Sequence, residues 1–307
     1  MRKMIGIKIR TVAFAVLLAI SVGKLGSYTF SKSVDANFLV VGVDDASENT
    51  DVISVVRVDT NGGKASFLQI PRDTYCSLDI YQQKINHIFS VARAEGANRE
   101  EAVLRLREFL SGALSVRIDG HILIDSKSFL NLVSAIGGID VKVDNELTLY
   151  DGSKPVLTLL KGENHLDPES AMILVRHRAG YLRGDIERLE MQRIFVSGLF
   201  NTLLNKVGLS DMMRVASALK ECETDIPVKS LISIFSNRKA FAGSAPIGTI
   251  LPGEAIKGKN GVWYYVLNRR MCDELLVGSF EIKSGLFDKD KHFLNESDDD
   301  FKNIYYR

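Results

Sequence analysis

The sequence lacks a surplus of charge of either sign. In 307 residues, 39 lysines and arginines oppose 38 aspartates and glutamates, which gives a formal net charge of +1. A general nucleic-acid-binding protein would carry a clear basic excess, so the composition argues against nucleic acid as a partner. The length allows one sizeable core, or a core with a small appendage.

Cysteines are few, and their spacing fits no framework. Cys76, Cys222 and Cys272 are far apart and odd in number, with no CxxC motif and no Cys/His ligand spacing. This excludes a disulfide scaffold and gives no indication of a zinc site. We expect all three to be inert, small apolar residues. The chain also has no internal repeats.

Long hydrophobic runs are scarce, and the clearest one is at the N-terminus. Basic residues at positions 2, 3, 8 and 10 precede the uncharged run Thr11–Gly23, the pattern of an export signal. The run is shorter than the roughly 20 apolar residues of a full membrane span. It is therefore a cleaved signal peptide, an anchor that extends over Ser27–Phe30, or a buried core helix. We favour an anchor over 11–30, with 1–10 in the cytoplasm, so that a single-pass protein of the cell membrane exposes its globular part outside.

A globular pattern begins at Asn37. The continuous apolar run Asn37–Val43 is typical of a strand buried on both faces. Strands are also predicted over 51–59, 64–70 and 120–125, and after Gly138. Helices are predicted over Ser90–Leu114, from Ser128 to Gly137, over 167–178 and over 185–206.

This order of elements predicts an α/β fold, an α-β-α sandwich with a mixed central sheet and helices on both faces. We expect the core to span 31–209. Residues 210–280 form the C-terminal part of the same domain, and 281–307 form a charged tail that includes the acidic stretch "ESDDD".

Carboxylates cluster where two predicted strands meet a loop. Asp44 and Asp45 end the first strand, and Asp51 begins the second. Such carboxylates can share a divalent cation of the Mg²⁺ type, which prefers oxygen ligands and keeps water and phosphate beside them. The alternative is ordinary turn chemistry, because loops use aspartate and asparagine in any case.

Two short polar stretches follow the third strand. In "IPRDTY" (Ile70–Tyr75), Pro71 cannot continue a central ladder, so Arg72 and Asp73 are expected at the sheet edge. "KINH" (Lys84–His87) places a cation beside an amide. Taken alone, each stretch is more often a solvated surface than a site.

The stretch "VRHRAGYLRGDIERLEMQR" (Val175–Arg193) is rich in arginine. If Asp185 is the N-cap of the helix, Arg188 lies in its first turn and Gln192 lies one turn further on the same face. Arg176 and Arg178 lead into this helix start. Because guanidinium groups pair with phosphate oxygens through two hydrogen bonds, the stretch predicts a phosphate or pyrophosphate site. The alternative is a loop neutralised by its own acidic residues.

Together these stretches resemble the LytR-CpsA-Psr family. The resemblance rests on the ordered motifs "NFLVVGVD", "TDVISVVRVD", "FLQIPRDTY", "KINH", "AIGGIDVKVD", "GENHLDPESAMILVRHR" and "GDIERLEMQR". They extend from about Asn37 to Lys206, and Leu251–Val266 is similar to the C-terminal portion of the family.

The resemblance implies a membrane-anchored phosphotransferase of a Gram-positive envelope. It would transfer a glycopolymer from an undecaprenyl-pyrophosphate carrier to a hydroxyl of peptidoglycan, with the prenyl chain in an apolar channel. Phosphoryl transfer depends on positioning and on neutralising charge, which suits a site of arginines and acids. The residues implied are Asp44 and Asp51 for Mg²⁺ (or Mn²⁺); Asp44, Asp51, Arg72 and Arg188 for catalysis; and Arg72, Lys84, Arg176, Arg178, Asp185, Arg188 and Gln192 for the pyrophosphate.

Two positions depart from the family pattern. Asn49 stands about where an arginine usually precedes the second aspartate, and Met191 stands where the helix motif usually has another arginine. Met191 is expected on the same helix face as Arg188, so a cation would be lost beside the anion. The departures favour one alternative, a lipid-pyrophosphate-binding scaffold or regulator of the envelope with little or no catalysis. A further alternative is a hydrolase that uses the same residues with water as acceptor.

Overall fold

The computed structural model describes residues 34–45, 47–76, 84–177, 185–205, 214–215, 217–219, 221–241, 247–258 and 261–280. The predicted membrane segment 11–30 and the charged tail 281–307 lie outside these residues. Within the described part of the chain, no helix combines the length and the apolar character that a membrane span requires.

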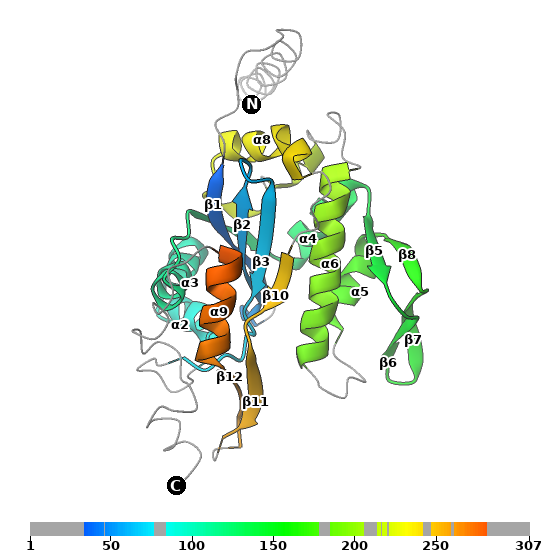
Figure 1. The fold of residues 1–307 in the computed structure, drawn as a ribbon. Coiled ribbons are helices and arrows are strands. Elements are labelled where there is room, and N and C mark those ends of the chain that lie inside the picture. The colour runs from blue at the N-terminus through cyan, green and yellow to red at the C-terminus, as the bar shows by residue number, and fades with distance from the viewer. Residues whose placement is uncertain are drawn as a thin grey trace, which may run out of the picture.

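A six-stranded mixed sheet forms the centre of the molecule, as the sequence predicts (Figure 1). β1 is antiparallel to β2 and parallel to β4, while β10 is parallel to β3. The strand order is β10-β3-β2-β1-β4-β9. The strands are β1 (Asp35–Val43), β2 (Thr50–Asp59), β3 (Lys64–Gln69), β4 (Gly120–Ile124), β9 (Glu223–Thr224) and β10 (Ile247–Ile250).

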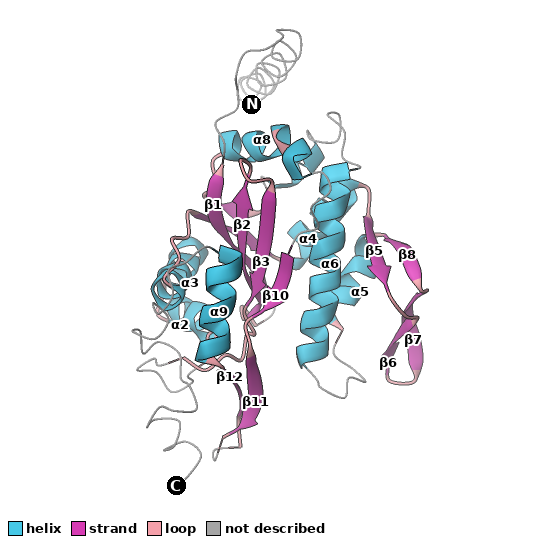
Figure 2. Ribbon diagram, viewed as in Figure 1, coloured by secondary structure: helices cyan, strands magenta, loops and turns pink. Residues whose placement is uncertain are grey.

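Helices cover both faces of this sheet (Figure 2). Side chains alternate across a strand, so Leu39 and Val41 of β1 point into one layer while Phe38 points into the other. The first layer contains α2 (His87–Ala94), α3 (Arg99–Leu114) and α9 (Arg269–Phe280). On the opposite side lie α4 (Ser126–Ile136), α5 (Pro168–Arg176), α6 (Asp185–Asn205), α8 (Val228–Ser236) and the 3-10 turn Arg238–Phe241.

Three two-stranded sheets complete the fold. The two sheets next to α4, α5 and α6 pack a separate apolar cluster, which includes Val141 and Leu149, against these helices. The third holds Tyr264 against Tyr75, with ring centroids 5.3 Å apart. The strands are β5 (Ile139–Val143) with β8 (Gly162–Leu166), β6 (Leu147–Asp151) with β7 (Lys154–Leu159), and β11 (Gly253–Lys257) with β12 (Trp263–Leu267).

The helix predicted over Ser90–Leu114 is wrong, because the structure has two helices there. Gly96 adopts a φ of +94° that only glycine tolerates well, which ends α2. Asn98 then begins α3 with a capping box, in which its side chain accepts a hydrogen bond from Glu101 N–H and the Glu101 carboxylate accepts one from Asn98 N–H. The other predicted helices and strands of the core are present with ends shifted by a few residues.

The cysteines are buried free thiols. Burial raises the pKa of Cys222 to about 11 and that of Cys272 to about 12, and it raises the pKa of Cys76 further. Because the thiolate is the reactive form, all three are poor nucleophiles at neutral pH, as expected.

Candidate functional site

An apolar cavity of about 160 Å³ lies between the sheet and the helices α4, α5 and α6. From the sheet, Val40 and Gly42 of β1 line it, because they alternate with the β1 side chains that face the opposite layer. At Gly42 a Cβ atom would lie 3.0 Å from Val52 Cβ, so this position has little room for a side chain. The helices contribute Phe129, Leu132, Val133, Met172, Val175, Phe195, Val196 and Leu199.

Asp44 and Asp51 lie together in the lining of this cavity. Asp44 directly follows β1, and its Oδ1 accepts hydrogen bonds from Ser47 N–H and Ser47 Oγ–H, both at 2.9 Å. The Asp44 N–H donates to Asn49 O at 3.0 Å, which closes the loop before β2. Asp51 is the second residue of β2. The predicted pair of carboxylates is therefore brought to one place.

Arg176, at the end of α5, also lies in the cavity lining. Its Nη2 donates to Ser126 Oγ at 2.7 Å and lies 3.8 Å from Asp44 Oδ2. The Ser126 hydroxyl in turn donates to the Asp45 carboxylate. A cation thus stands beside one predicted metal ligand, with its side chain about half exposed and open to an anion.

Arg72 and Lys84 form a second cationic group next to the first. Arg72 Nη1 lies 2.5 Å from Asp51 Oδ1, so Asp51 connects this group with the cavity. Asp73 holds the two cations together, with Oδ2 3.6 Å from Arg72 Nε and Oδ1 2.6 Å from Lys84 Nζ. Lys84 Nζ also lies 5.6 Å from the centre of the Tyr264 ring.

Gln192 lies in the lining of the cavity, and its side-chain amide is hydrogen-bonded to other groups of the protein. Its Oε1 accepts a hydrogen bond from Gln69 Nε2 at 2.7 Å, and its Nε2 donates to Val175 O at 3.2 Å. The side chain is buried. Gln192 therefore ties α6 to β3 and α5, and this fixes the helix that carries Arg188.

The predicted pyrophosphate set also includes Arg178, Asp185 and Arg188. Arg178 lies outside the described residues. Asp185 and Arg188 belong to the first turns of α6, of which the structure describes the backbone. Asp185 is the first residue of that helix, within one residue of its predicted role as the N-cap.

Met191 directly precedes Gln192 in the sequence, but the two side chains lie in different environments. It packs against the apolar cluster of Val141 and Val143 and lines a different cleft, between α6 and β5. Asn49 accepts the Asp44 hydrogen bond through its backbone carbonyl. The two departures from the family pattern thus lie in different places, one in the loop between the carboxylates and one on the β5 side of α6.

Two residues of the site were not predicted. Ser126 follows β4, and its neighbour Asp125 caps α4 by accepting from Ser128 N–H at 2.8 Å. Burial opposes ionisation of Asp125, yet the hydrogen bonds from Ser128 and the charge of Arg99 lower its pKa overall. The sequence does contain a signal for Ser126, because the end of a strand followed by a helix cap is a usual place for ligand-binding groups in α/β folds.

The second unpredicted residue is Glu48, in the loop between Asp44 and Asp51. Its carboxylate lies 2.6 Å from Arg93 Nε and 3.6 Å from Arg99 Nε. The hydrogen bond from Arg93 lowers the pKa of Glu48, so the carboxylate stays ionised at neutral pH. Arg93 of α2 and Arg99 of α3 therefore hold this loop through the side chain of Glu48.

The donor set at the cavity suits a hard cation with mostly external ligands. No group of three or more His, Cys, Asp or Glu side chains within the described residues is arranged to hold a metal ion. Three carboxylates of the described part of the chain line the cavity: Asp125 caps α4, and Asp44 and Asp51 are the two predicted to hold the ion. This fits Mg²⁺, which usually takes one or two carboxylates and completes its shell with water and phosphate.

Comparison with known proteins identifies a family. The profile of the LytR_cpsA_psr family matches residues 21–277. The polyisoprenyl-teichoic acid–peptidoglycan teichoic acid transferase TagU of Bacillus anthracis is 28% identical over 242 residues, covering 76% of this chain and 75% of that protein. The cell wall biosynthesis protein LcpA of Corynebacterium glutamicum is 27% identical over 203 residues, covering 59% of this chain and 38% of that protein.

Solved structures share the fold. Bacillus subtilis TagV superposes with a TM-score of 0.64 at 22% identity, over 84% of this chain and 98% of that one. TagT bound to LIIa-WTA superposes with a TM-score of 0.63 at 20% identity, over 84% and 95% respectively.

Proposed function

The chain belongs to the LytR_cpsA_psr family, and from this premise we propose that it transfers a glycopolymer from a polyprenyl-pyrophosphate carrier to peptidoglycan. The name of its relative TagU describes such a transfer, of teichoic acid to peptidoglycan. LcpA is named for cell wall biosynthesis. The carrier in this proposal is undecaprenyl pyrophosphate, and the protein is a single-pass membrane protein with its catalytic domain outside the cell.

One observation carries the proposal: an apolar cavity that has acids and an arginine in its lining. A prenyl chain needs apolar walls, which α4, α5, α6 and the sheet supply. Its pyrophosphate needs cations and hydrogen-bond donors, which Arg176 can supply with Arg72 and Lys84 close behind. Arg178 and Arg188 complete the phosphate-binding set in this proposal.

The proposed step is a displacement at phosphorus. A hydroxyl oxygen of the acceptor forms a bond to the phosphorus that carries the glycan, and the bond from that phosphorus to the bridging oxygen breaks. The products are a phosphodiester and a prenyl monophosphate, and the hydroxyl proton leaves to a base such as the Asp51 carboxylate. Arginines that hold the phosphate oxygens stabilise the charge that develops on them.

A Mg²⁺ or Mn²⁺ ion fits Asp44 and Asp51 and would neutralise the charge of the pyrophosphate oxygens. The chain itself contributes the position of both carboxylates. Asp44 is fixed by Ser47, and Asp51 is fixed by Arg72.

A transfer assay with the full chain in detergent micelles tests the proposal. The chain is incubated with a polyprenyl-pyrophosphate glycan, Mg²⁺ and peptidoglycan oligomers, and we expect polymer attached to the acceptor. Release of phosphate or of free glycan without attachment would identify a hydrolase. Tight binding of the donor without turnover would identify a scaffold, and either result would overturn the proposal.

Replacement of Arg176 sharpens this assay. We expect Arg176→Ala to lose about 1.5–3 kcal/mol of contact with the pyrophosphate, which corresponds to a rate lower by about 10- to 100-fold. The matched control is Arg117→Ala, because the Arg117 side chain is 80% exposed and is paired with Asp119 away from the cavity. Equal losses in both variants would contradict the assignment of Arg176.

A further inference from the structure

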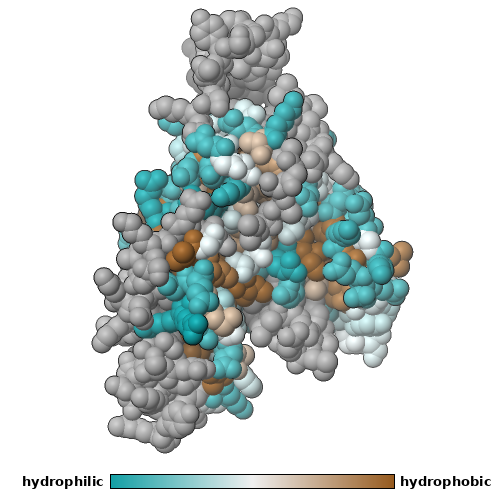
Figure 3. Space-filling model, in the orientation of Figure 1, coloured by the Kyte–Doolittle hydropathy of each residue, from teal (hydrophilic) through white to brown (hydrophobic). Residues whose placement is uncertain are grey.

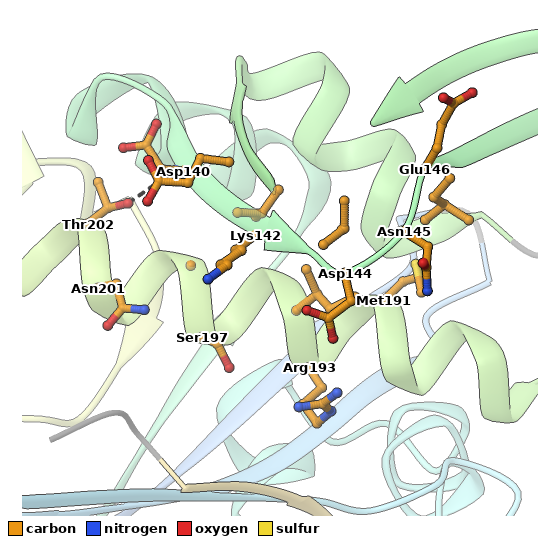
Figure 4. Close-up of a pocket in the computed structure, with 16 residues that line it drawn as sticks. Asp140, Lys142, Asp144, Asn145, Glu146, Met191, Arg193, Ser197, Asn201 and Thr202 are labelled. Atoms are coloured by element: carbon orange, nitrogen blue, oxygen red, sulfur yellow. Dashed lines mark hydrogen bonds between the residues drawn. The ribbon is translucent and has the colours of Figure 1, made fainter. Parts of the chain in front are cut away.

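A second concavity, of about 680 Å³, lies on the other side of α6 from the apolar cavity. Ser197, Asn201 and Arg193 of α6 form one wall, and the segment from Asp140 to Leu147 forms the other (Figure 4). Gln192, Phe195, Val196 and Leu199 face the apolar cavity instead. The helix thus separates two sites, and this one has no part in the proposed binding of the donor.

Gly198 sets the shape of this cleft. A Cβ atom there would lie 2.6 Å from Asp140 O, so glycine lets β5 approach α6 closely. At the same place Asp140 N–H donates to Thr202 Oγ1 at 3.2 Å. The cleft extends from this contact along α6 to Met191, one residue from Gln192 of the apolar cavity.

The polar groups of the cleft are largely available to a ligand. Within the part of the chain that the structure describes, the side chains of Lys142, Asp144, Glu146 and Asn201 make no hydrogen bond or ion pair, and all four are exposed. Lys142 and Asn201 supply donors, and Asp144, Glu146 and Asn201 supply acceptors. A ligand with many hydroxyl groups, each both donor and acceptor, can satisfy such a set.

The floor of the cleft is apolar. Met191 and Ile194 of α6 face Leu147, and all three pack against the cluster beneath. In Figure 3, hydrophilic residues surround a hydrophobic patch over α6 and the β5–β8 side of the molecule. An apolar floor with a polar rim matches a sugar ring, which has C–H groups on its faces and hydroxyls at its edge.

The charge of the cleft excludes a polyanion. Its lining carries the carboxylates Asp140, Asp144, Glu146 and Glu163 against the cations Lys142 and Arg193. Asp140 is bonded to His165 at 2.8 Å, and Arg193 is paired with Glu190 at 2.8 Å. A phosphate-rich polymer would be repelled by this excess of acid. The arginine-lined apolar cavity, in contrast, suits the anionic end of the donor.

We propose that this cleft binds a glycan without net negative charge, of the amino-sugar type, and that it holds the acceptor strand during transfer. The second part rests on the proposed function, because it takes the acceptor to be peptidoglycan. The cleft ends next to Gln192, so a strand that lies along α6 leads toward the cavity that binds the donor.

Isothermal titration of the full chain in detergent micelles with a tetrasaccharide of N-acetylglucosamine tests the site without any donor. The unaltered chain binds the tetrasaccharide, and Asn201→Trp, which fills the cleft from an exposed position, weakens binding at least tenfold. Lys142→Ala, on the opposite wall, weakens it as well. The control Ser134→Trp replaces an exposed serine of α4 outside both cavities and leaves binding unchanged.

Three results overturn the proposal: no binding by the unaltered chain, equal binding by Asn201→Trp, and displacement of the tetrasaccharide by inorganic polyphosphate. The proposed function is judged separately by binding of a polyprenyl pyrophosphate, which Asn201→Trp leaves unchanged because its side chain lies across α6 from the apolar cavity. In the transfer assay the same variant raises KM for the acceptor and leaves KM for the donor unchanged.

Discussion

The backbone at Glu48 is held in a conformation that glutamate rarely adopts. Its φ is +49°, in the left-handed region that costs a non-glycine residue about 1 kcal/mol or more. The ion pairs with Arg93 and Arg99 offset this cost, and the Glu48 N–H donates to Asp44 O at 2.9 Å. The two ion pairs and this hydrogen bond together fix the loop that carries Asp44.

We expect Glu48→Ala to slow transfer about tenfold, an effect of about 1.4 kcal/mol, because Asp44 loses its fixed position. The Mg²⁺ concentration for half-maximal rate rises in the same variant, a change that a merely less stable protein would not show. The measurement is the transfer rate as a function of Mg²⁺ at a temperature at which both proteins are folded.

The control for this variant is Glu95→Ala. Glu95 forms an exposed ion pair with Arg105 at 2.5 Å, away from the loop. Exposed pairs contribute about 0–1 kcal/mol, so the rate and its Mg²⁺ dependence remain those of the unaltered chain. A normal Mg²⁺ response in Glu48→Ala would contradict the role of the ion pairs in positioning Asp44.

Met191 gives a second prediction for a single side chain. Because Met191 packs against Val141 and lines the β5 side of α6, an arginine there would extend into the cleft and away from the apolar cavity. We expect Met191→Arg to leave binding of a polyprenyl pyrophosphate unchanged within about twofold, since no contact with the anion is added. Binding that tightens by tenfold or more would show that the position belongs to the pyrophosphate site.

Regular sequence patterns account for those predicted residues that the structure places in one cavity. Asp44 and Asp51 stand at the ends of apolar strands, Gln192 follows from helical spacing, and all three line the apolar cavity. Glu48 was missed because its partner Arg93 is 45 residues away, and Ser126 because its partner Arg176 is 50 residues away. Contacts at such separations depend on how the helices pack, which local pattern does not determine.

At the level of elements, glycine decides where helices can approach their neighbours. At Gly198, in the middle of α6, a Cβ atom would meet Asp140 O at 2.6 Å and Val141 Cγ1 at 2.8 Å. At Gly278, in α9, it would meet nothing within 4 Å. Replacement of glycine by alanine is therefore expected to have opposite effects on stability in the two helices.

We expect Gly198→Ala to destabilise the protein by about 1–3 kcal/mol, as overpacking does. Gly278→Ala is the matched control and should stabilise it by about 0.5–1 kcal/mol, because alanine favours the helix. Both effects are read from the free energy of unfolding in urea. A neutral Gly198→Ala would contradict the close packing of α6 against β5.

The prediction of helices was wrong where one residue changed the local conformation of the backbone. The apolar spacing from Ser90 to Leu114 continues across Gly96 and Asn98, so periodicity alone predicted one helix. The capping box that begins α3 is local and could have been recognised from Asn98 and Glu101. The pair β6–β7 was missed because two short strands outside the central sheet give a weak alternation, and their packing on α5 supplies what the pattern lacks.

At the level of the whole molecule, the histidine and the carboxyl groups with resolved shifts act in one direction as the pH falls below neutral. Burial lowers the pKa of His121, although Asp225, 3.2 Å away, acts in the opposite sense. The carboxyl groups of Glu48, Asp125 and Asp225 also have lowered pKa values. In each case the unfolded chain binds protons more readily than the folded one.

The sign follows from linkage. A group with a lowered pKa contributes stability that is complete above its unfolded pKa and is lost as the pH falls through its folded pKa. For His121 the loss begins below about pH 6.5, the unperturbed value for histidine, and the carboxyl groups add their loss below about pH 4. The free energy of unfolding should therefore decrease steadily from pH 7 toward acid.

We expect His121→Gln to flatten the upper part of this decrease, between about pH 6.5 and 5, because the group that takes up the proton on unfolding is gone. The variant is less stable at pH 7.5, since His121 is buried beside Asp225 and Arg107. Melting temperatures of the full chain at a series of pH values provide the measurement. His165→Gln is the control, because the His165 side chain is 61% exposed. An unchanged slope in His121→Gln would mean that other groups govern the acid sensitivity of the fold.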